Sequence, residues 1–150
     1  MNISARQIWL EMTERSFLEI DAVRSTIIRA REIGYCVAID DFGTGYSSLQ
    51  YLQGLPLDSL KIDKSFIDTI GKDTATSSVT SHIIEMAKTL NLIIVAEGIE
   101  TQEELDYLRA REVDLGQGWF FAKAMPADEF IAYCDRERDE ADIGRRYAAL

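Results

Sequence analysis

The sequence predicts an α/β protein whose parallel strands form part of a (β/α) barrel. Strand-like and helix-like patterns alternate along the 150 residues, and the second expected strand, residues 35–39, is continuously apolar. Such a strand is typical of a sheet that is covered on both faces. Polar side chains recur where successive strands end. Repeated strand–helix units favour parallel strands joined by right-handed crossovers, which together give this fold class.

The first half of the chain is expected to form two strands and two helices. Residues 6–12 form the first strand, and residues 21–33 carry apolar side chains near helical spacing up to Gly34, which ends the helix. Residues 35–39 form the second strand. Ser47 is expected to cap a short helix over residues 48–52.

The second half continues the alternation. Thr101 and Glu104 have the spacing of a capping box, and Pro126 fits the first turn of a helix. The expected elements are a strand over 60–63, a helix over 77–90, a strand over 92–96, a helix over 102–111, a strand with its exit loop over 115–121, and a helix over 126–138. The charged residues 139–150 are expected to fray, so one domain segment with a core over about 6–138 is predicted.

Composition excludes some classes of function. The 16 basic and 26 acidic residues give a net charge of −10, which argues against a protein that binds nucleic-acid polymers nonspecifically. It does not exclude a phosphate ester held through metal ions. No apolar run is long enough to cross a bilayer and no signal peptide is recognised, so a cytoplasmic chain without membrane contact is expected. Cys36 and Cys134 match no metal spacing and are expected to be buried free thiols.

Polar residues at the ends of the expected strands indicate a site. In a (β/α) barrel the carboxyl ends of the strands converge on one face, where such enzymes build their active sites. Carboxylates are the ligands preferred by Mg²⁺ and Mn²⁺, and two adjacent carboxylates repel each other unless a cation neutralises them. The residues concerned are Glu11, Asp40, Asp41, Lys61, Glu97 and Gln117.

These residues fit the hydrolysis of a phosphodiester. Two metal ions can activate a water and stabilise the leaving oxygen, and Lys61 could orient that water or help to deprotonate it. Plainer interpretations remain open for single residues. Asp40 and Asp41 could form an acidic turn before a helix, and Lys61 could be a surface lysine or a partner of Asp63. His82, the only histidine, is expected to be an ordinary helix side chain.

Five segments resemble, in order, the motifs of the EAL-domain cyclic di-GMP phosphodiesterases, over about residues 6–134. The resemblance implies hydrolysis of cyclic di-GMP to linear pGpG with Mg²⁺ or Mn²⁺. It also implies Glu11, Asp40, Asp41 and Glu97 as metal ligands, Lys61 at the attacking water, Glu14 as the anchor of loop 40–49, and Gln117 as a polar contact beside the metals. The segments are residues 10–14, 40–49, 61–66, 96–101, and Gln117-Gly118 with Pro126.

The chain departs from the family pattern at its start. The Glu-Ala-Leu motif and an Asn ligand of the family lie upstream of the segment that resembles residues 10–14, and a full barrel takes roughly 250 residues. We therefore expect the carboxyl-terminal part of an EAL domain, inactive alone. An inert nucleotide-binding or protein-interaction module is the alternative, and another magnesium-dependent barrel enzyme is a third.

The missing strands predict self-association. Five strands cannot close a barrel, so two free sheet edges and an open apolar face are expected, and both favour a dimer or larger assembly. The sheet residues, with helices on one side and the barrel interior on the other, are expected to be Val37, Ile39, Leu60, Ile62, Ile93 and Val95.

Overall fold

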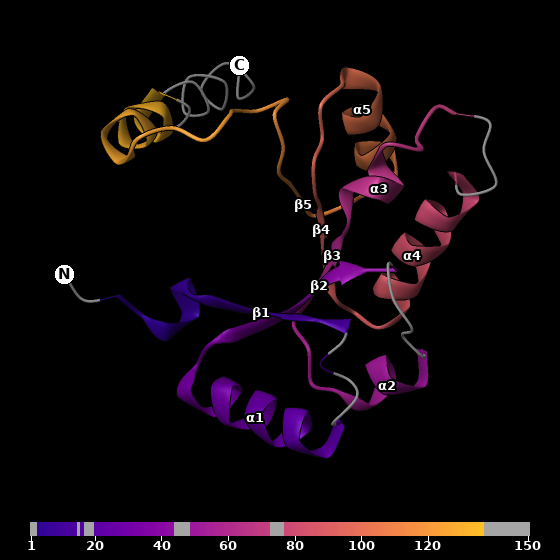
Figure 1. The fold of residues 1–150 in the computed structure, drawn as a ribbon, viewed down its shortest axis with the longest axis vertical. Helices are drawn as coiled ribbons and strands as arrows, with labels where there is room; N and C mark the ends of the chain where they lie inside the picture. Colours follow the sequence, from indigo (N-terminus) through magenta and orange to yellow (C-terminus); the bar gives the residue numbers. More distant parts are fainter. Residues whose placement is uncertain (1–2, 15, 17–19, 44–48, 73–76, 137–150) are drawn as a thin grey trace, which may run out of the picture.

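The computed structural model describes residues 3–14, 16, 20–43, 49–72 and 77–136, and their strands form one parallel sheet (Figure 1). The sheet order follows the chain, and each strand pairs with its sequence neighbours. This is the order of strands in a barrel wall, so the predicted fold class is confirmed. The strands are β1 (Trp9–Thr13), β2 (Cys36–Phe42), β3 (Ser59–Ile62), β4 (Ile93–Ala96) and β5 (Leu115–Gly116).

Helices line one side of this sheet, as Figure 1 shows, and the helical residues 127–136 stand apart from it. The carbonyl of Pro126 accepts the Phe130 amide at 2.9 Å, which places the proline at the start of that last helix, as predicted. The other helices are α1 (Ile20–Ile33), α2 (Leu49–Gly54), α3 (Lys64–Ile67), α4 (Ser77–Thr89) and α5 (Gln102–Ala110), and the short 3-10 helix η1 (Ala5–Gln7) precedes β1.

Two predicted strands are shorter than expected. Residues 6 and 7 belong to η1, because the Gln7 amide donates to the Ser4 carbonyl at 2.9 Å and closes a turn there. At the other end β5 has two residues, since the Phe121 amide bonds to the Gly118 carbonyl at 3.1 Å. Local hydrogen bonds compete with strand pairing at both places.

Two other boundaries are confirmed. Gly34 follows α1 with a φ of +105°, a left-handed conformation that favours glycine. Thr101 is the N-cap of α5, with the reciprocal hydrogen bonds of a capping box to Glu104. The predicted cap at Ser47 and the predicted fraying of residues 139–150 lie outside the described residues.

The core lies between the sheet and its helices, and the expected open apolar face is largely wrong. Of the six residues expected in the sheet between the helices and the barrel interior, Ile93 is exposed, at 39%, and the other five are buried, so they do not form an open face. Six of the twelve exposed large apolar side chains among the described residues lie at or next to the two edge strands of the sheet. They are Ile8 and Leu10 at the β1 edge, and Leu115, Trp119, Phe120 and Phe121 at the β5 edge.

Both cysteines are free, but the expectation that they are buried is wrong. Cys134 is exposed because helix 127–136 lies apart from the core, and Cys36, at the start of β2, is half-buried. Among the described residues, no helix has the length and apolar character needed to cross a membrane.

The amino ends of the strands are joined by two equivalent contacts. Asp58, just before β3, accepts the Val37 amide of β2 at 2.9 Å. Asp114, just before β5, accepts the Ile94 amide of β4 at 2.8 Å. Each carboxylate ties the start of one strand to its neighbour, which helps to set the register that brings the opposite strand ends together.

Candidate active site

The sequence-predicted polar residues converge at the carboxyl ends of the strands. Because all five strands are parallel, their carboxyl ends lie at the same edge of the sheet. Each strand contributes at least one side chain, from its middle, from its carboxyl-terminal half or from the residue that follows it. These are Glu11 from β1, Asp40 and Asp41 from β2, Lys61 from β3, Glu97 after β4 and Gln117 after β5.

A bulge in β2 brings two neighbouring carboxylates to the same place. Ile39 pairs with Leu60 and Phe42 with Ile62, so β2 has one extra residue here. Asp41 has a φ of +53°, outside normal strand conformation. Neighbouring strand side chains ordinarily point to opposite faces, and a bulge re-aims one of them.

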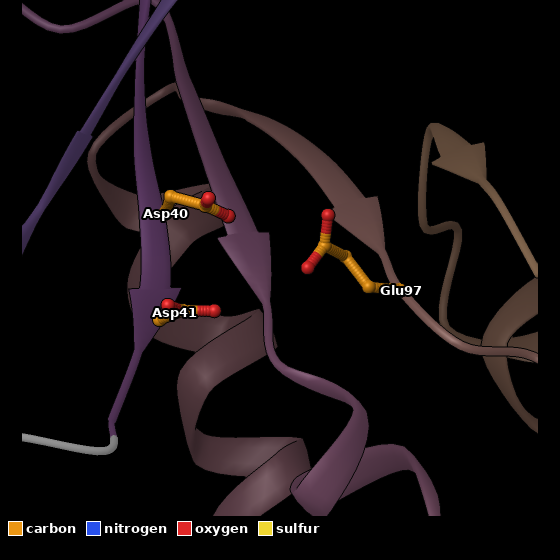
Figure 2. Close-up of side chains that lie close together, drawn as sticks. All are labelled: Asp40, Asp41 and Glu97. Carbon is orange, nitrogen blue, oxygen red and sulfur yellow. The ribbon is translucent and has the colours of Figure 1, made fainter.

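The prediction that the two aspartates follow the strand is wrong, because both lie inside β2. Figure 2 shows that the carboxylates of Asp40 and Asp41 both point toward Glu97. One oxygen from each of the three side chains lies within 4.8 Å of the other two.

Lys61 joins three of the four predicted carboxylates. Its Nζ lies 2.8 Å from Glu11 Oε1, 2.9 Å from Asp40 Oδ1 and 2.7 Å from Glu97 Oε1. Burial lowers the pKa of Lys61, but hydrogen bonds to these carboxylates more than offset the burial and leave the pKa above its ordinary value. Lys61 is therefore a protonated ammonium at the centre of the site.

The alternative in which Lys61 pairs with Asp63 does not match the structure. Asp63 accepts the Ser65 amide at 3.0 Å and caps α3, a helix that the sequence reasoning missed. The spacing of an Asp two residues before a Ser was the available signal, because aspartate side chains often accept a backbone amide two residues later.

Glu97 connects the lysine to the last strand. Burial raises the pKa of Glu97, while the hydrogen bond from Lys61 acts in the opposite direction. Gln117 Nε2 donates to the same oxygen, Glu97 Oε1, at 2.7 Å. Lys61 and Gln117 thus hold Glu97 from both sides.

Glu14 lies outside this cluster and contacts the backbone after β2. Its Oε1 accepts the Gly43 amide at 2.8 Å, and the residue is 8% exposed. Gly43 has a φ of +96°, and a Cβ there would lie 2.6 Å from the Phe66 ring. The contact expected between Glu14 and loop 40–49 is therefore present at Gly43, whereas residues 44–48 lie outside the described residues.

The donor set fits a hard divalent cation. Glu11, Asp40, Asp41 and Glu97 offer only carboxylate oxygens, which Mg²⁺ and Mn²⁺ prefer. Lys61 supplies one positive charge against these four carboxylates, so the ordinary ionised forms leave the site electronegative. His82 is exposed on α4, as expected of an ordinary helix residue.

A matching family model covers most of the chain. The EAL domain model matches residues 1–124, which include every residue of the candidate site. The chain belongs to the EAL family. This membership confirms the resemblance that the ordered motifs indicate.

Similar proteins agree with this membership. The chain is 50% identical over 134 residues to the probable cyclic di-GMP phosphodiesterase PdeB of Escherichia coli, covering 89% of this chain and 25% of PdeB. It resembles the solved PaMucR phosphodiesterase in its c-di-GMP complex, with a TM-score of 0.81, 37% identity, and coverage of 85% of this chain and 52% of that one.

A manganese/cy-diGMP complex of Klebsiella pneumoniae BlrP1 is also similar, with a TM-score of 0.73, 30% identity, and coverage of 81% of this chain and 31% of that one. The chain spans about a quarter of the length of the first curated relatives that it matches. Its structural neighbours are EAL domains, in agreement with the five parallel strands of its sheet.

Proposed function

We propose that this chain is part of a cyclic di-GMP phosphodiesterase that produces linear pGpG with Mg²⁺ or Mn²⁺. The observation that carries the proposal is the approach of the Asp40, Asp41 and Glu97 oxygens to within 4.8 Å of one another, beside Lys61. The relatives named as cyclic di-GMP phosphodiesterases support the choice of substrate.

Glu11, Asp40, Asp41 and Glu97 are the residues that would hold the metal ions. The fit rests on the hard oxygen donors and on the excess of negative charge over the single Lys61 ammonium. When bound, divalent ions supply positive charge to the phosphodiester oxygens and acidify a water. In the manganese/cy-diGMP complex of BlrP1 a related chain holds both components.

Lys61 would act on the attacking water as a hydrogen-bond donor. Its three carboxylate partners keep it protonated, which favours orientation of the water over removal of a proton. Gln117 would keep Glu97 in place through its 2.7 Å hydrogen bond, and Glu14 would hold the backbone that follows the two aspartates.

We further propose that residues 1–150 form the carboxyl-terminal part of a single EAL domain, with a core over about 6–138. Coverage of 52% of the PaMucR chain and the unpaired outer side of β1 among the described strands support this division. On this view the substrate site needs side chains from additional strands, and the 150 residues alone do not sustain turnover.

The second candidate function is a binding module. The exposed apolar residues at the β1 and β5 edges favour it, because such edges pair readily with other strands. A second copy of the chain could occupy them, and nucleotide would then be bound without being hydrolysed.

A comparison of two proteins tests these alternatives. Cyclic di-GMP would be incubated with this chain and with a version extended by the preceding half of an EAL barrel from PdeB, with Mn²⁺ or with EDTA. We expect pGpG only from the extended version with Mn²⁺, and none from its Asp40→Asn variant. Metal-dependent nucleotide binding without product in both versions would favour the binding module.

A further inference from the structure

Lys64, the first residue of α3, lies against the backbone that follows Glu97. Gly98 has a φ of +71°, and a Cβ at this glycine would lie 2.5 Å from Lys64 Cγ and 2.7 Å from Lys64 Cδ. The lysine stem therefore rests directly on the Gly98 Cα. A side chain at position 98 would displace the stem or the turn itself.

The ammonium of Lys64 reaches Glu100, at the other end of the turn formed by residues 97–100. Its Nζ lies 2.6 Å from Oδ1 of Asp68, the residue that follows α3, and 3.1 Å from Glu100 Oε1. On the far side, the Glu100 amide donates to Glu104 Oε2 at 2.8 Å. Residues 97–100 are thus held between α3 and α5.

We propose that Lys64 is a positioning residue for Glu97, acting through its packing on Gly98 and its ion pair with Glu100. The inference rests on the proposed function only in treating Glu97 as a site carboxylate. Lys64 touches neither Lys61 nor Gln117 in any recorded hydrogen bond or ion pair of the described residues, so its effect passes through the backbone.

Small movements of this turn matter because Glu97 is held tightly. Glu97 Oε1 lies 2.7 Å from Lys61 Nζ and 2.7 Å from Gln117 Nε2. A shift of about 1 Å at Gly98 would lengthen at least one of these contacts beyond hydrogen-bond distance. The Gln117 side-chain amide therefore reports the position of Glu97 without any metal.

The plainer alternative is that Lys64 forms an ordinary pair with Asp68, four residues later on a helix surface. Such pairs contribute little and act only locally. The two interpretations differ in which carboxylate matters. Positioning requires Glu100, whereas a helix surface pair requires Asp68.

The test follows the NMR signals of the Gln117 side-chain amide in the metal-free 150-residue chain. We expect Lys64→Met and Glu100→Gln to move these signals toward their positions in Glu97→Gln, and Lys64→Ala to move them further because the stem is also lost. Lys64→Arg should restore the wild-type positions. Asp68→Asn should leave them unchanged.

Lys88→Met is the matched control, because Lys88 is 40% exposed and pairs with Glu112 at 2.9 Å on another part of the surface. It should not move the Gln117 signals. Shifts with Asp68→Asn but not with Glu100→Gln, or equal shifts with Lys88→Met, would overturn the proposal. So would unchanged signals in Lys64→Ala.

Manganese binding separates this inference from the proposed function. If the chain binds Mn²⁺ through its carboxylates, Lys64→Met should raise the dissociation constant about tenfold, as expected for residues that orient metal ligands. If neither wild type nor variants bind Mn²⁺, the metal role fails while the amide signals still decide the role of Lys64. Binding of Mn²⁺ with equal affinity by wild type and Lys64→Ala would contradict positioning.

Discussion

Glu14 accepts a hydrogen bond from the Gly43 amide at 2.8 Å, although 29 positions separate the two residues. The contact joins the chain after β1 to the turn after β2. The Glu14 carboxylate thus binds a backbone amide. The carboxylates of Asp40 and Asp41, just before that turn, instead point toward Glu97 (Figure 2).

Glu14→Ala should loosen the turn that carries the aspartates. The change removes a buried side-chain acceptor from the Gly43 amide, which lowers the free energy of unfolding by about 2 kcal/mol. We expect faster hydrogen exchange at the Gly43 amide and weaker Mn²⁺ binding. Glu112→Ala, at an 85% exposed side chain, is the control. Unchanged exchange at Gly43 would show that Glu14 does not hold the turn.

Asp41→Asn should abolish turnover by an extended EAL-domain version while preserving the fold. Asparagine tolerates the φ of +53° that the bulge requires, so the backbone stays as it is and only the charge is lost. Asp40→Asn should have the same effect on turnover. Thermal unfolding and pGpG formation with Mn²⁺ would be measured, and near-normal turnover by both variants would contradict the metal role.

The contribution of Lys61 to the free energy of unfolding should decrease at alkaline pH. Because its pKa is raised in the folded chain, its contribution is complete below the ordinary lysine pKa of 10.5 and is lost as pH rises through the higher folded value. Lys61→Met should lower the free energy of unfolding by about 2 kcal/mol at neutral pH, since it leaves the half-buried carboxylates of Asp40 and Glu97 without their cation. The difference between wild type and Lys61→Met should shrink above pH 10.5. A constant difference in urea unfolding across this range would contradict this account.

Much of the fold and the membership of the site follow from patterns in the sequence. Strand and helix alternation predicts the parallel sheet, and polar residues at five strand ends predict which side chains meet. The bulge in β2 could not be predicted in this way, because alternation in a regular strand would send Asp40 and Asp41 to opposite faces.

Contacts that depend on the packing of one element against another could not be predicted from the sequence either. The packing of the Lys64 side chain on Gly98 depends on how closely α3 approaches the end of β4. The spacing of apolar residues in the sequence does not predict that distance. The same holds for the apolar face, where burial of Val95 and exposure of Ile93 depend on how neighbouring elements cover β4.

Asp114→Ala should destabilise the fold without affecting the strand-end site. Asp114 accepts the Ile94 amide at 2.8 Å, and its loss leaves a buried donor without this acceptor, which lowers the free energy of unfolding by about 1–2 kcal/mol. Asp58→Ala should act similarly at Val37. Urea unfolding measures both, and a change no larger than that in Glu112→Ala would show that these contacts do not stabilise the strand starts.

The last prediction concerns the two sheet edges. Leu10 is 39% exposed on β1 and Leu115 is 50% exposed on β5, and each lies on a strand with one paired neighbour in the described sheet. Pairing of the β5 edge of one copy with the β1 edge of another would bury both side chains and satisfy backbone groups, so we expect a dimer or larger at micromolar concentration.

Leu115→Lys should shift sedimentation toward the monomer, because a charge at an edge opposes strand pairing. Ile33→Lys, at a 63% exposed position at the end of α1, should leave the assembly intact. A monodisperse wild-type monomer would contradict edge pairing, and equal dissociation by both lysine variants would mean that association depends on general apolar exposure instead of the strand edges.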